Sequence, residues 1–480
     1  MRVIHISAEC YPAAKSGGLG DVVGALPKYL TQSGVDTSVI LPKYGMKWIN
    51  SQHWSVVYAG KVRLRQVMVP FTIEEHRGPV DLGYRLFVAN IPGFYDRNGI
   101  YADDYGGFGD EVERYILFQQ TALQWIAQFG TKPQVIHCHD HHTGLVPFMM
   151  KHCPEYWSLS QVPSIFTIHN GNYQGAFSWK NMSALPIFEA KAAGLLDWND
   201  TINPMAAGIK CSWAFTTVSQ SYMEEMRGNS MGLEPLIRTE WGKSLGILNG
   251  IDVQTWNPAT DPMLATRFDG DVNAYKAANK KVICERFGLD PFRPLFSFIG
   301  RLVGEKGADL LPDAFEQFIN EGDRGSVALL GTGEQHLHHA FGHLAYQYQG
   351  TFGCSLAYNE TLSHQIYAGA DFLLMPSRVE PCGLNQMYAQ RYGTVPIVRR
   401  IGGLKDTVHD ISMSGGTGIT FDQLRVGDIV HAMHRAADMY EHWSSMTLLR
   451  QRMMGIDHSW EHSTATYTRL YERISGKKLH

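Results

Sequence analysis

The sequence predicts an α/β protein made of two Rossmann-like, doubly wound domains. Short β-rich runs recur along the 480 residues, each ending in a glycine-rich or polar loop, and helical patterns separate them. Strands that alternate with helices pair in parallel and are covered by helices on both faces. Two series of such units are too many for one compact sheet, and the Asn-Pro and Asp-Pro breaks within 253–262 predict a domain boundary. We expect a first domain at 1–252 and a second beginning at 253.

The individual elements follow from periodicity and turn residues. The clearest helix is Leu19–Leu30, whose apolar residues recur at i, i+3, i+4 and i+7, and Gly34 marks its end. Residues 55–90 contain alternating strands with turn signals, which predicts an antiparallel excursion. The other expected strands are Val3–Ala8, Thr37–Leu41, Val135–His139, Ile165–His169, Phe215–Val218, Leu295–Ile299, Ser326–Leu330, Phe372–Met375 and Val395–Val398.

Composition excludes several classes of protein. With 42 Lys+Arg against 46 Asp+Glu, the formal net charge of −4 gives no general attraction to nucleic acid or to an anionic membrane. The seven cysteines include no Cys-x-x-Cys pair, which argues against a disulfide framework and a thiolate zinc site. The N-terminus is not a signal peptide, and no window approaches the ~18 consecutive apolar residues of a membrane span. We expect a soluble protein of the reducing cytoplasm.

The loop after the first strand has the composition of an anion site. Lys15 stands beside Gly17 and Gly18, which open the predicted helix, so a cation, exposed N–H groups and the positive helix end converge there. A diphosphate suits this loop. A flexible loop with a solvated lysine remains an alternative, whereas a dinucleotide fingerprint fits poorly because the glycine spacing is wrong.

Two loops in the second half carry matching chemistry. Arg301 and Lys306 follow a predicted strand, where two cations can neutralise a leaving diphosphate. Glu380 follows another strand end and lies between Pro and Gly residues, where a carboxylate can accept hydrogen bonds from sugar hydroxyls. The alternatives are surface salt bridges for the cations and a helix-capping or solvated role for Glu380.

A histidine cluster lies at 137–142. It resembles the His-x-His-x-Asp-His run of binuclear metallohydrolases, but Asp140 stands one position early for that motif. We expect His139 and Asp140 to line a cleft at a strand end, with the other rings packed or solvated. His169 ends the next predicted strand on the same side, where a purely structural histidine is the alternative.

Taken together, these segments resemble the bacterial glycogen synthase and plant starch synthase family. Six separated motifs occur in the family's order between residue 1 and about 408, and Ser459-Trp460 resembles the start of its last helix. His137–Gly144 matches the family's His-x-His-Asp-x-His-x-Gly run, which replaces the metallohydrolase interpretation. The other matching segments are Lys15–Asp21, Thr167–Gly175, Leu248–Asp252, Arg301–Gly307 and Glu380–Leu384 followed by Gln386.

The resemblance implies the GT-B architecture, in which two Rossmann-like domains face each other across a deep cleft. It implies a second domain at 253–455 and a terminal helix, 456–480, that crosses back to the first. The implied reaction is retaining transfer of glucose from ADP-glucose to the non-reducing 4-hydroxyl of an α-1,4-glucan such as glycogen. No cofactor and no metal ion are implied. UDP-glucose as the donor and a non-catalytic glucan-binding protein remain alternatives.

The resemblance also assigns roles to residues. His169, Arg301, Lys306 and Glu380 are the expected catalytic residues, with the two cations at the diphosphate, Glu380 at the glucose hydroxyls and His169 near the anomeric centre. Tyr388 stands where many related retaining transferases have a second glutamate, so the usual ribose contact must be replaced. The expected substrate-binding residues are Lys15, Gly17, Gly18, Leu19, Asp21, Asp140, Asn170, Asn249, Tyr358, Cys382, Gly383 and Leu384.

Overall fold

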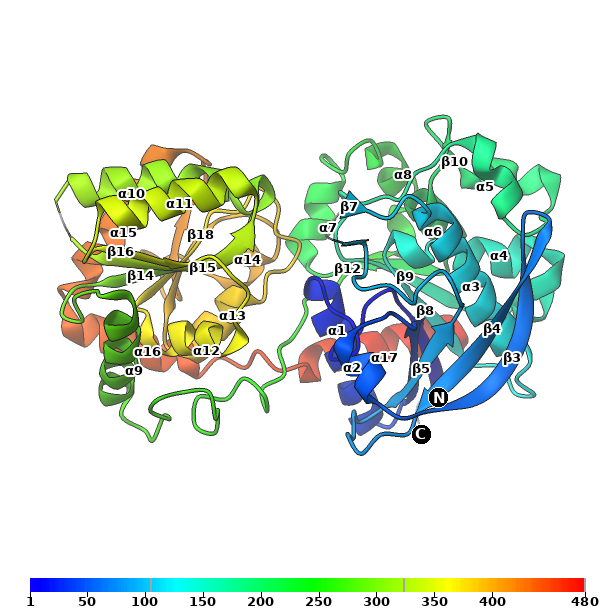
Figure 1. Cartoon of the computed structure of the whole chain (residues 1–480), viewed down its shortest axis with the longest axis horizontal. Coiled ribbons are helices and arrows are strands. Elements are labelled where there is room, and N and C mark those ends of the chain that lie inside the picture. The colour runs from blue at the N-terminus through cyan, green and yellow to red at the C-terminus, as the bar shows by residue number, and fades with distance from the viewer. Residues whose placement is uncertain (104–105, 323, 479–480) are drawn as a thin grey trace. The chain divides into compact units, whose positions relative to one another are not determined.

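The computed structural model describes residues 1–103, 106–322 and 324–478. The chain divides into two compact units. Unit 1 comprises Met1–Asn249 with Trp460–His480, and unit 2 comprises Gly250–Ser459. The sequence placed the corresponding boundaries at 252/253 and 455/456. Each unit contains one large sheet with helices packed against it (Figure 1).

Unit 1 is organised around a sheet with the strand order β13-β12-β9-β8-β1-β2-β5-β4-β3. Every neighbouring pair is parallel except β3–β4 and β4–β5, which confirms the antiparallel excursion predicted for 55–90. Because β1, β8 and β9 are parallel neighbours, the loops at their carboxyl ends share one edge of the sheet. In sheet order the strands are Ser244–Gly246, Ala214–Thr217, Ser164–Ile168, Val135–His139, Arg2–Ile6, Asp36–Pro42, Arg85–Asn90, Val67–His76 and Trp54–Leu64.

The last helix of the chain belongs to the core of unit 1. In Figure 1 the red helix α17 runs beside the dark-blue helix α1. Val22 and Leu26 of α1 pack in one apolar cluster with Trp460 and with Tyr467 of α17. Burying a large apolar side chain contributes about 1.5–3 kcal/mol, so this cluster holds the terminal helix firmly. The helices of unit 1 are α1 (Gly18–Gln32), α2 (Lys47–Ser51), α3 (Glu111–Ala127), α4 (Val146–His152), α5 (Ala193–Leu196), α6 (Pro204–Cys211), α7 (Gln220–Met226), α8 (Glu234–Thr239) and α17 (Glu461–Ser475). Two further pairs of short strands are antiparallel, β6 (Ala102–Asp103) with β7 (Gly106–Gly107) and β10 (Asp197–Trp198) with β11 (Thr201–Ile202).

Unit 2 has an entirely parallel sheet within the described residues, in the order β16-β15-β14-β17-β18-β19. The strands are Phe352–Ser355, Ser326–Gly333, Leu295–Leu302, Phe372–Met375, Val395–Arg399 and Ile419–Phe421. The helices are α9 (Val272–Phe287), α10 (Leu311–Asn320), α11 (Gln335–Gln347), α12 (Glu360–Gly369), α13 (Asn385–Arg391), α14 (Gly402–Thr407), α15 (Val426–Tyr440) and α16 (Trp443–Met454).

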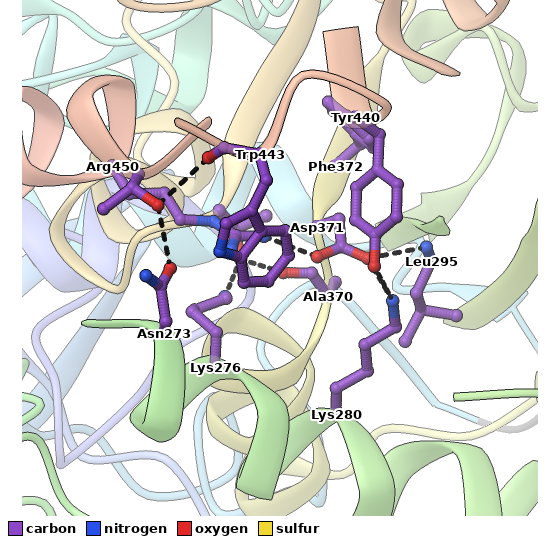
Figure 2. Close-up of polar contacts among 12 residues, drawn as sticks. Asn273, Lys276, Lys280, Leu295, Ala370, Asp371, Phe372, Tyr440, Trp443 and Arg450 are labelled. Atoms are coloured by element: carbon purple, nitrogen blue, oxygen red, sulfur yellow. Dashed lines mark hydrogen bonds and ion pairs between the residues drawn. The ribbon is translucent and has the colours of Figure 1, made fainter. Parts of the chain in front are cut away.

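A buried ion cluster fastens two helices of unit 2 to its sheet (Figure 2). Asp371, the residue before β17, is buried and pairs with Lys280 of α9 at 2.7 Å and with Arg450 of α16. Burial by itself would raise the pKa of Asp371, but the two cations lower it below its usual value. The carboxylate therefore stays charged and holds α9 and α16 together.

Lys276 lies next to this cluster as a buried amine of a different kind. Its Nζ donates to the Thr394 hydroxyl at 2.7 Å and lies 3.2 and 3.3 Å from the carbonyl oxygens of Tyr367 and Tyr392. Burial, together with the nearby Arg450 cation, holds the pKa of Lys276 well below its ordinary value. These three acceptors satisfy a buried amine without a carboxylate of its own.

Candidate active site

The carboxyl edge of the unit 2 sheet brings Lys306 and Glu380 into direct contact. Lys306 follows β14 and Glu380 follows the neighbouring strand β17. The Lys306 Nζ donates to both carboxylate oxygens of Glu380 at 2.8 Å, and the Ser377 hydroxyl donates to Glu380 Oε2 at 2.8 Å. Glu380 is buried, while the Lys306 side chain is 23% exposed.

Two glycines allow these loops to approach so closely. Gly307 has φ +69°, and a Cβ built there would lie 2.0 Å from the Pro376 carbonyl oxygen. Gly402 has φ +43°, and its Cβ would lie 2.0 Å from the carbonyl oxygen of Glu380. No L side chain fits at either place without moving the backbone that carries the ion pair.

The remaining expected residues of unit 2 lie around this pair. Strand β14 extends further than predicted, so Arg301 lies on the strand opposite Thr332 rather than in the loop after it. Its half-exposed guanidinium pairs with Glu305 at 3.2 Å. Tyr358 follows the edge strand β16, and its side chain is exposed. Cys382, Gly383 and Leu384 form the turn between Glu380 and helix α13.

Helix α13 fixes this turn through its own side chains. The Gln386 amide donates to the carbonyls of Cys382 and Gly383 at 3.0 and 2.9 Å. The Asn385 amide donates to the Ile299 carbonyl of β14 at 2.8 Å. Tyr388, which stands in place of a second glutamate, is buried and stacks on Trp256 with ring centroids 3.7 Å apart. Position 388 is thus part of the packing of unit 2.

In unit 1, the glycine loop after β1 is held by a residue that the sequence analysis did not assign. The carboxylate of Glu9 accepts hydrogen bonds from the amides of Ser16 and Gly17 at 2.6 and 3.1 Å and from the Tyr101 hydroxyl at 2.6 Å. The Gly17 amide, expected at the substrate diphosphate, therefore binds Glu9 instead. Burial raises the pKa of Glu9, although the two amides and Tyr101 oppose that rise. A carboxylate directly before a glycine loop was the available signal.

Lys15 and Asp21 meet in the same loop. The Lys15 Nζ lies 2.7 Å from Asp21 Oδ1, and both side chains are partly exposed. Gly18 and Leu19 form the first turn of α1, and no atom lies within 4 Å of a Cβ built at Gly17 or Gly18 among the residues that the structure describes. The start of α1 thus has open space beside a partly exposed lysine.

Asp140 positions the peptide of His169 at the shared edge of β8 and β9. Asp140 Oδ1 accepts the backbone amide of His169 at 2.7 Å, and the Asn170 amide also donates to this carboxylate. Asp140 adopts φ +57°, an uncommon conformation for a residue that is not glycine. Burial raises the pKa of Asp140 to about 7, against the opposing effect of these amides. The structure therefore joins three of the expected site residues.

The expectation that His139 lines a cleft is wrong. His139 is fully buried, because His5 of the neighbouring strand β1 and His169 at the end of β9 enclose it. His139 Nδ1 lies 3.0 Å from His169 Nε2, and His139 Nε2 lies 2.9 Å from His5 Nδ1. His137 is also buried and stacks on His139 at 4.3 Å between ring centroids. A parallel strand that is buried on both faces shows no alternation of polar and apolar residues. Its sequence therefore does not reveal whether a side chain at its end is exposed to a cleft or packed against other residues.

Two groups of side chains in the described residues lie close enough to share a metal ion. One consists of His5, His137 and His139, in which every ring nitrogen except His5 Nε2 is already in a hydrogen bond. An ion there would have to replace these bonds. The other consists of Glu111, His141 and His142.

Asn249 is the last residue of the first segment of unit 1. It is buried, and its Oδ1 has no hydrogen-bond partner among the described residues. Asn249 therefore lies where the chain passes from unit 1 to unit 2. The other expected site residues form two groups, one at the carboxyl edge of each large sheet.

Comparison with known proteins identifies the family. Residues 2–239 match the family model described as starch synthase catalytic domain, and residues 280–447 match glycosyl transferases group 1. A glycogen synthase of Flavobacterium johnsoniae is 45% identical over 480 residues, covering all of both chains. The chain belongs to the glycogen synthase and starch synthase family. As a member of this family it is a glucosyltransferase of glycogen or starch synthesis.

Other relatives agree with this membership. A glycogen synthase of Rhodospirillum rubrum is 37% identical, with complete coverage of both chains. The catalytic domain of starch synthase IV from Arabidopsis thaliana, solved with ADP and acarbose, has a TM-score of 0.90 at 32% identity and 99% coverage of both chains. This similarity confirms the prediction of two α/β domains with parallel sheets. A helix both long and apolar enough to span a bilayer is not found among the residues that the structure describes.

Proposed function

We propose that this member of the glycogen synthase and starch synthase family transfers glucose from ADP-glucose to the non-reducing 4-hydroxyl of an α-1,4-glucan. The anomeric configuration is retained and ADP is released. The observation that carries the proposal is the Lys306–Glu380 pair, with both oxygens of Glu380 at 2.8 Å from the ammonium. It places a group suited to phosphate and a group suited to sugar hydroxyls at one point of a sheet edge.

The donor binds at unit 2 in this proposal. Lys306 and Arg301 neutralise the diphosphate, and Glu380 accepts hydrogen bonds from the glucose 3- and 4-hydroxyls beside the Gly383 and Leu384 amides. Before the donor binds, the carboxylate of Glu380 compensates the positive charge of the partly buried Lys306 ammonium. The exposed ring of Tyr358 offers a stacking surface for the nucleotide base.

Unit 1 contributes the groups around the anomeric carbon and the acceptor. Asp140 fixes the peptide of His169, so that its carbonyl oxygen faces the carbon on which positive charge develops. Lys15 and the start of α1 supply positive potential toward the diphosphate. Asp21 and Asn170 contact the donor sugar. These roles require the two groups of residues to face each other across a cleft when both substrates are bound, and closure over the substrates would exclude water.

We favour departure and attack on the same face of the sugar. A retaining double displacement uses a pair of carboxylates that flank the scissile bond. The sequence motifs pair no second carboxylate with Glu380, which accepts hydrogen bonds from Lys306 and Ser377. In the proposed step the bond from the anomeric carbon to the phosphate oxygen breaks while the bond to the acceptor oxygen forms. The acceptor's proton passes to the leaving phosphate, which the two cations stabilise.

The proposal includes the identity of the nucleotide base in the sugar donor. The starch synthase IV structure contains ADP, which supports an adenine nucleotide here.

We also expect the reaction in a reducing compartment such as the cytoplasm, because all seven cysteines are free thiols.

The test is nucleoside diphosphate release from ADP-glucose and from UDP-glucose, each with and without glycogen, in the presence of a chelator. The proposal predicts glycogen-dependent release of ADP and much slower release of UDP. Faster release of UDP would overturn the assignment of the donor. Absence of release from both donors would overturn the glucan synthase activity and favour a protein that only binds glucan.

A further inference from the structure

Three imidazoles in unit 1 form a single hydrogen-bonded chain. His5 is the penultimate residue of β1, His139 ends β8, and His169 follows β9. His5 Nδ1 lies 2.9 Å from His139 Nε2, and His139 Nδ1 lies 3.0 Å from His169 Nε2. His5 and His139 are fully buried, and His169 is 8% exposed. The chain thus runs from the core of the sheet to the residue expected at the anomeric carbon.

The rings are neutral at physiological pH. Burial lowers the pKa of His5 and of His169 to about 3, and that of His139 well below its usual value. A neutral imidazole donates through one nitrogen and accepts at the other. His139, bonded at both nitrogens, therefore accepts from one neighbour and donates to the other.

This leaves two arrangements of protons for the chain. In the first, each ring carries its proton on Nδ1, so His5 donates to His139 and His139 donates to His169. In the second, each ring carries its proton on Nε2 and every bond runs the opposite way. The choice at any one ring fixes the other two.

The inner end of the chain distinguishes the two arrangements. Among the residues that the structure describes, His5 Nε2 is buried with no hydrogen-bond partner. The second arrangement would place an N–H there without an acceptor, whereas the first leaves only a lone pair. Orphaned buried donors are rarer in proteins than under-satisfied acceptors. The first arrangement is therefore favoured.

We infer that His5 and His139 are positioning residues that hold His169 as its Nδ1–H tautomer, with Nε2 bonded inward and Nδ1–H free to donate toward the substrates. The inference rests on the proposed function in one respect: that function supplies the substrate to which the Nδ1–H group of His169 would donate. His137 stays outside the chain, because its nitrogens bond to the hydroxyls of Tyr471 and Thr167. The chain ends at His5 Nε2, so it locks a tautomer and does not conduct protons.

The direct test is the ring ¹⁵N spectrum of the full-length protein labelled with ¹⁵N-histidine. The signals of His169 are those that disappear in His169→Asn. The inference predicts a protonated Nδ1 and an unprotonated Nε2 for His169 near neutral pH. A protonated Nε2, or signals averaged between two tautomers, would overturn it. This readout needs no substrate, so it stands or falls separately from the proposed reaction.

A matched pair of variants at His5 tests the consequence for transfer. His5→Phe keeps a ring but removes the donor to His139, whereas the amide of His5→Asn can still donate from nearly the position of Nδ1. Partners that orient metal-bound histidines typically contribute 10- to 100-fold to affinity or activity, and we take this as the scale for an orienting hydrogen bond here. We expect kcat to fall by about that factor in His5→Phe, with KM for the donor little changed and the His169 tautomer signature lost. In His5→Asn, we expect most of the kcat and most of the His169 tautomer signature to be retained. Normal kcat in folded His5→Phe, or equal loss in both variants, would overturn the inference.

Discussion

Replacing Gly402 by alanine should inactivate the protein without unfolding it. The new Cβ would lie 2.0 Å from the Glu380 carbonyl oxygen, whereas ordinary contact begins at 3.4 Å. The backbone that carries Glu380 must therefore move by about 1.4 Å, and it cannot yield as a flexible side chain would. Because a misplacement of about 1 Å can cost about 10²-fold in rate, we expect kcat to fall by at least that factor, or roughly 2.7 kcal/mol.

Gly415 provides the matched control. It also has a positive φ, +78°, but no atom lies within 4 Å of its Cβ among the described residues. Both alanine variants carry the conformational cost of about 1–2 kcal/mol for a side chain in this region. The assay is steady-state release of ADP with glycogen, beside a urea unfolding curve for each variant. Near-normal kcat in Gly402→Ala, or equal loss of kcat in Gly415→Ala, would refute the argument that the loop contact positions Glu380.

Three further predictions follow from the charges of the structure. Asp371→Asn leaves two buried cations without a carboxylate and should cost about 3–5 kcal/mol of unfolding free energy by urea titration. Asp422→Asn, which breaks an exposed pair, should cost less than about 1 kcal/mol. Because burial lowers the pKa of His5 and His169 to about 3, the stability that they contribute is present above pH 6.5 and falls toward pH 3. The loss should be about 1.4 kcal/mol per pH unit for each histidine, measured as urea midpoints from pH 7 to 4. Lys306→Ala should lose about 10²–10³-fold in kcat while it remains folded.

Each of these predictions has a contrary outcome. Equal destabilisation by the two aspartate variants would show that the buried cluster does not depend on its carboxylate. Urea midpoints that do not change between pH 7 and 4 would mean that the histidines are not held neutral. Lys281→Ala, at an exposed pair on α9, is the matched control for Lys306→Ala, and equal activity of the two variants would remove Lys306 from the catalytic residues.

The sequence was sufficient for the features that depend on local patterns. The antiparallel excursion and helix α1 could be predicted because periodicity and turn residues determine them. The sequence also placed Lys306 and Glu380 each after a strand, where ligands of parallel sheets bind. Their direct contact was not predicted, because it depends on β14 and β17 being neighbours in the sheet.

Features that depend on tertiary packing could not be predicted in this way. Lys276 and Lys280 are one helical turn apart on α9 and have the spacing of a solvated face, yet both are buried because Asp371 and Thr394 lie opposite them. Glu9 offered a local signal, a carboxylate directly before a glycine loop, but its bond from the Tyr101 hydroxyl did not. The buried lysines and the buried histidines of unit 1 are determined by partners far away in the sequence.

The central claim is that the chain elongates α-1,4-glucans from a nucleotide sugar with retention. The most direct measurement follows radiolabelled glucose from ADP-glucose into glycogen and then digests the product with an exo-acting enzyme that removes maltose from non-reducing α-1,4-linked ends. The account predicts label in the polymer and its complete release as maltose. Label that remains as free glucose, or polymer-bound label that resists this digestion, would contradict the account.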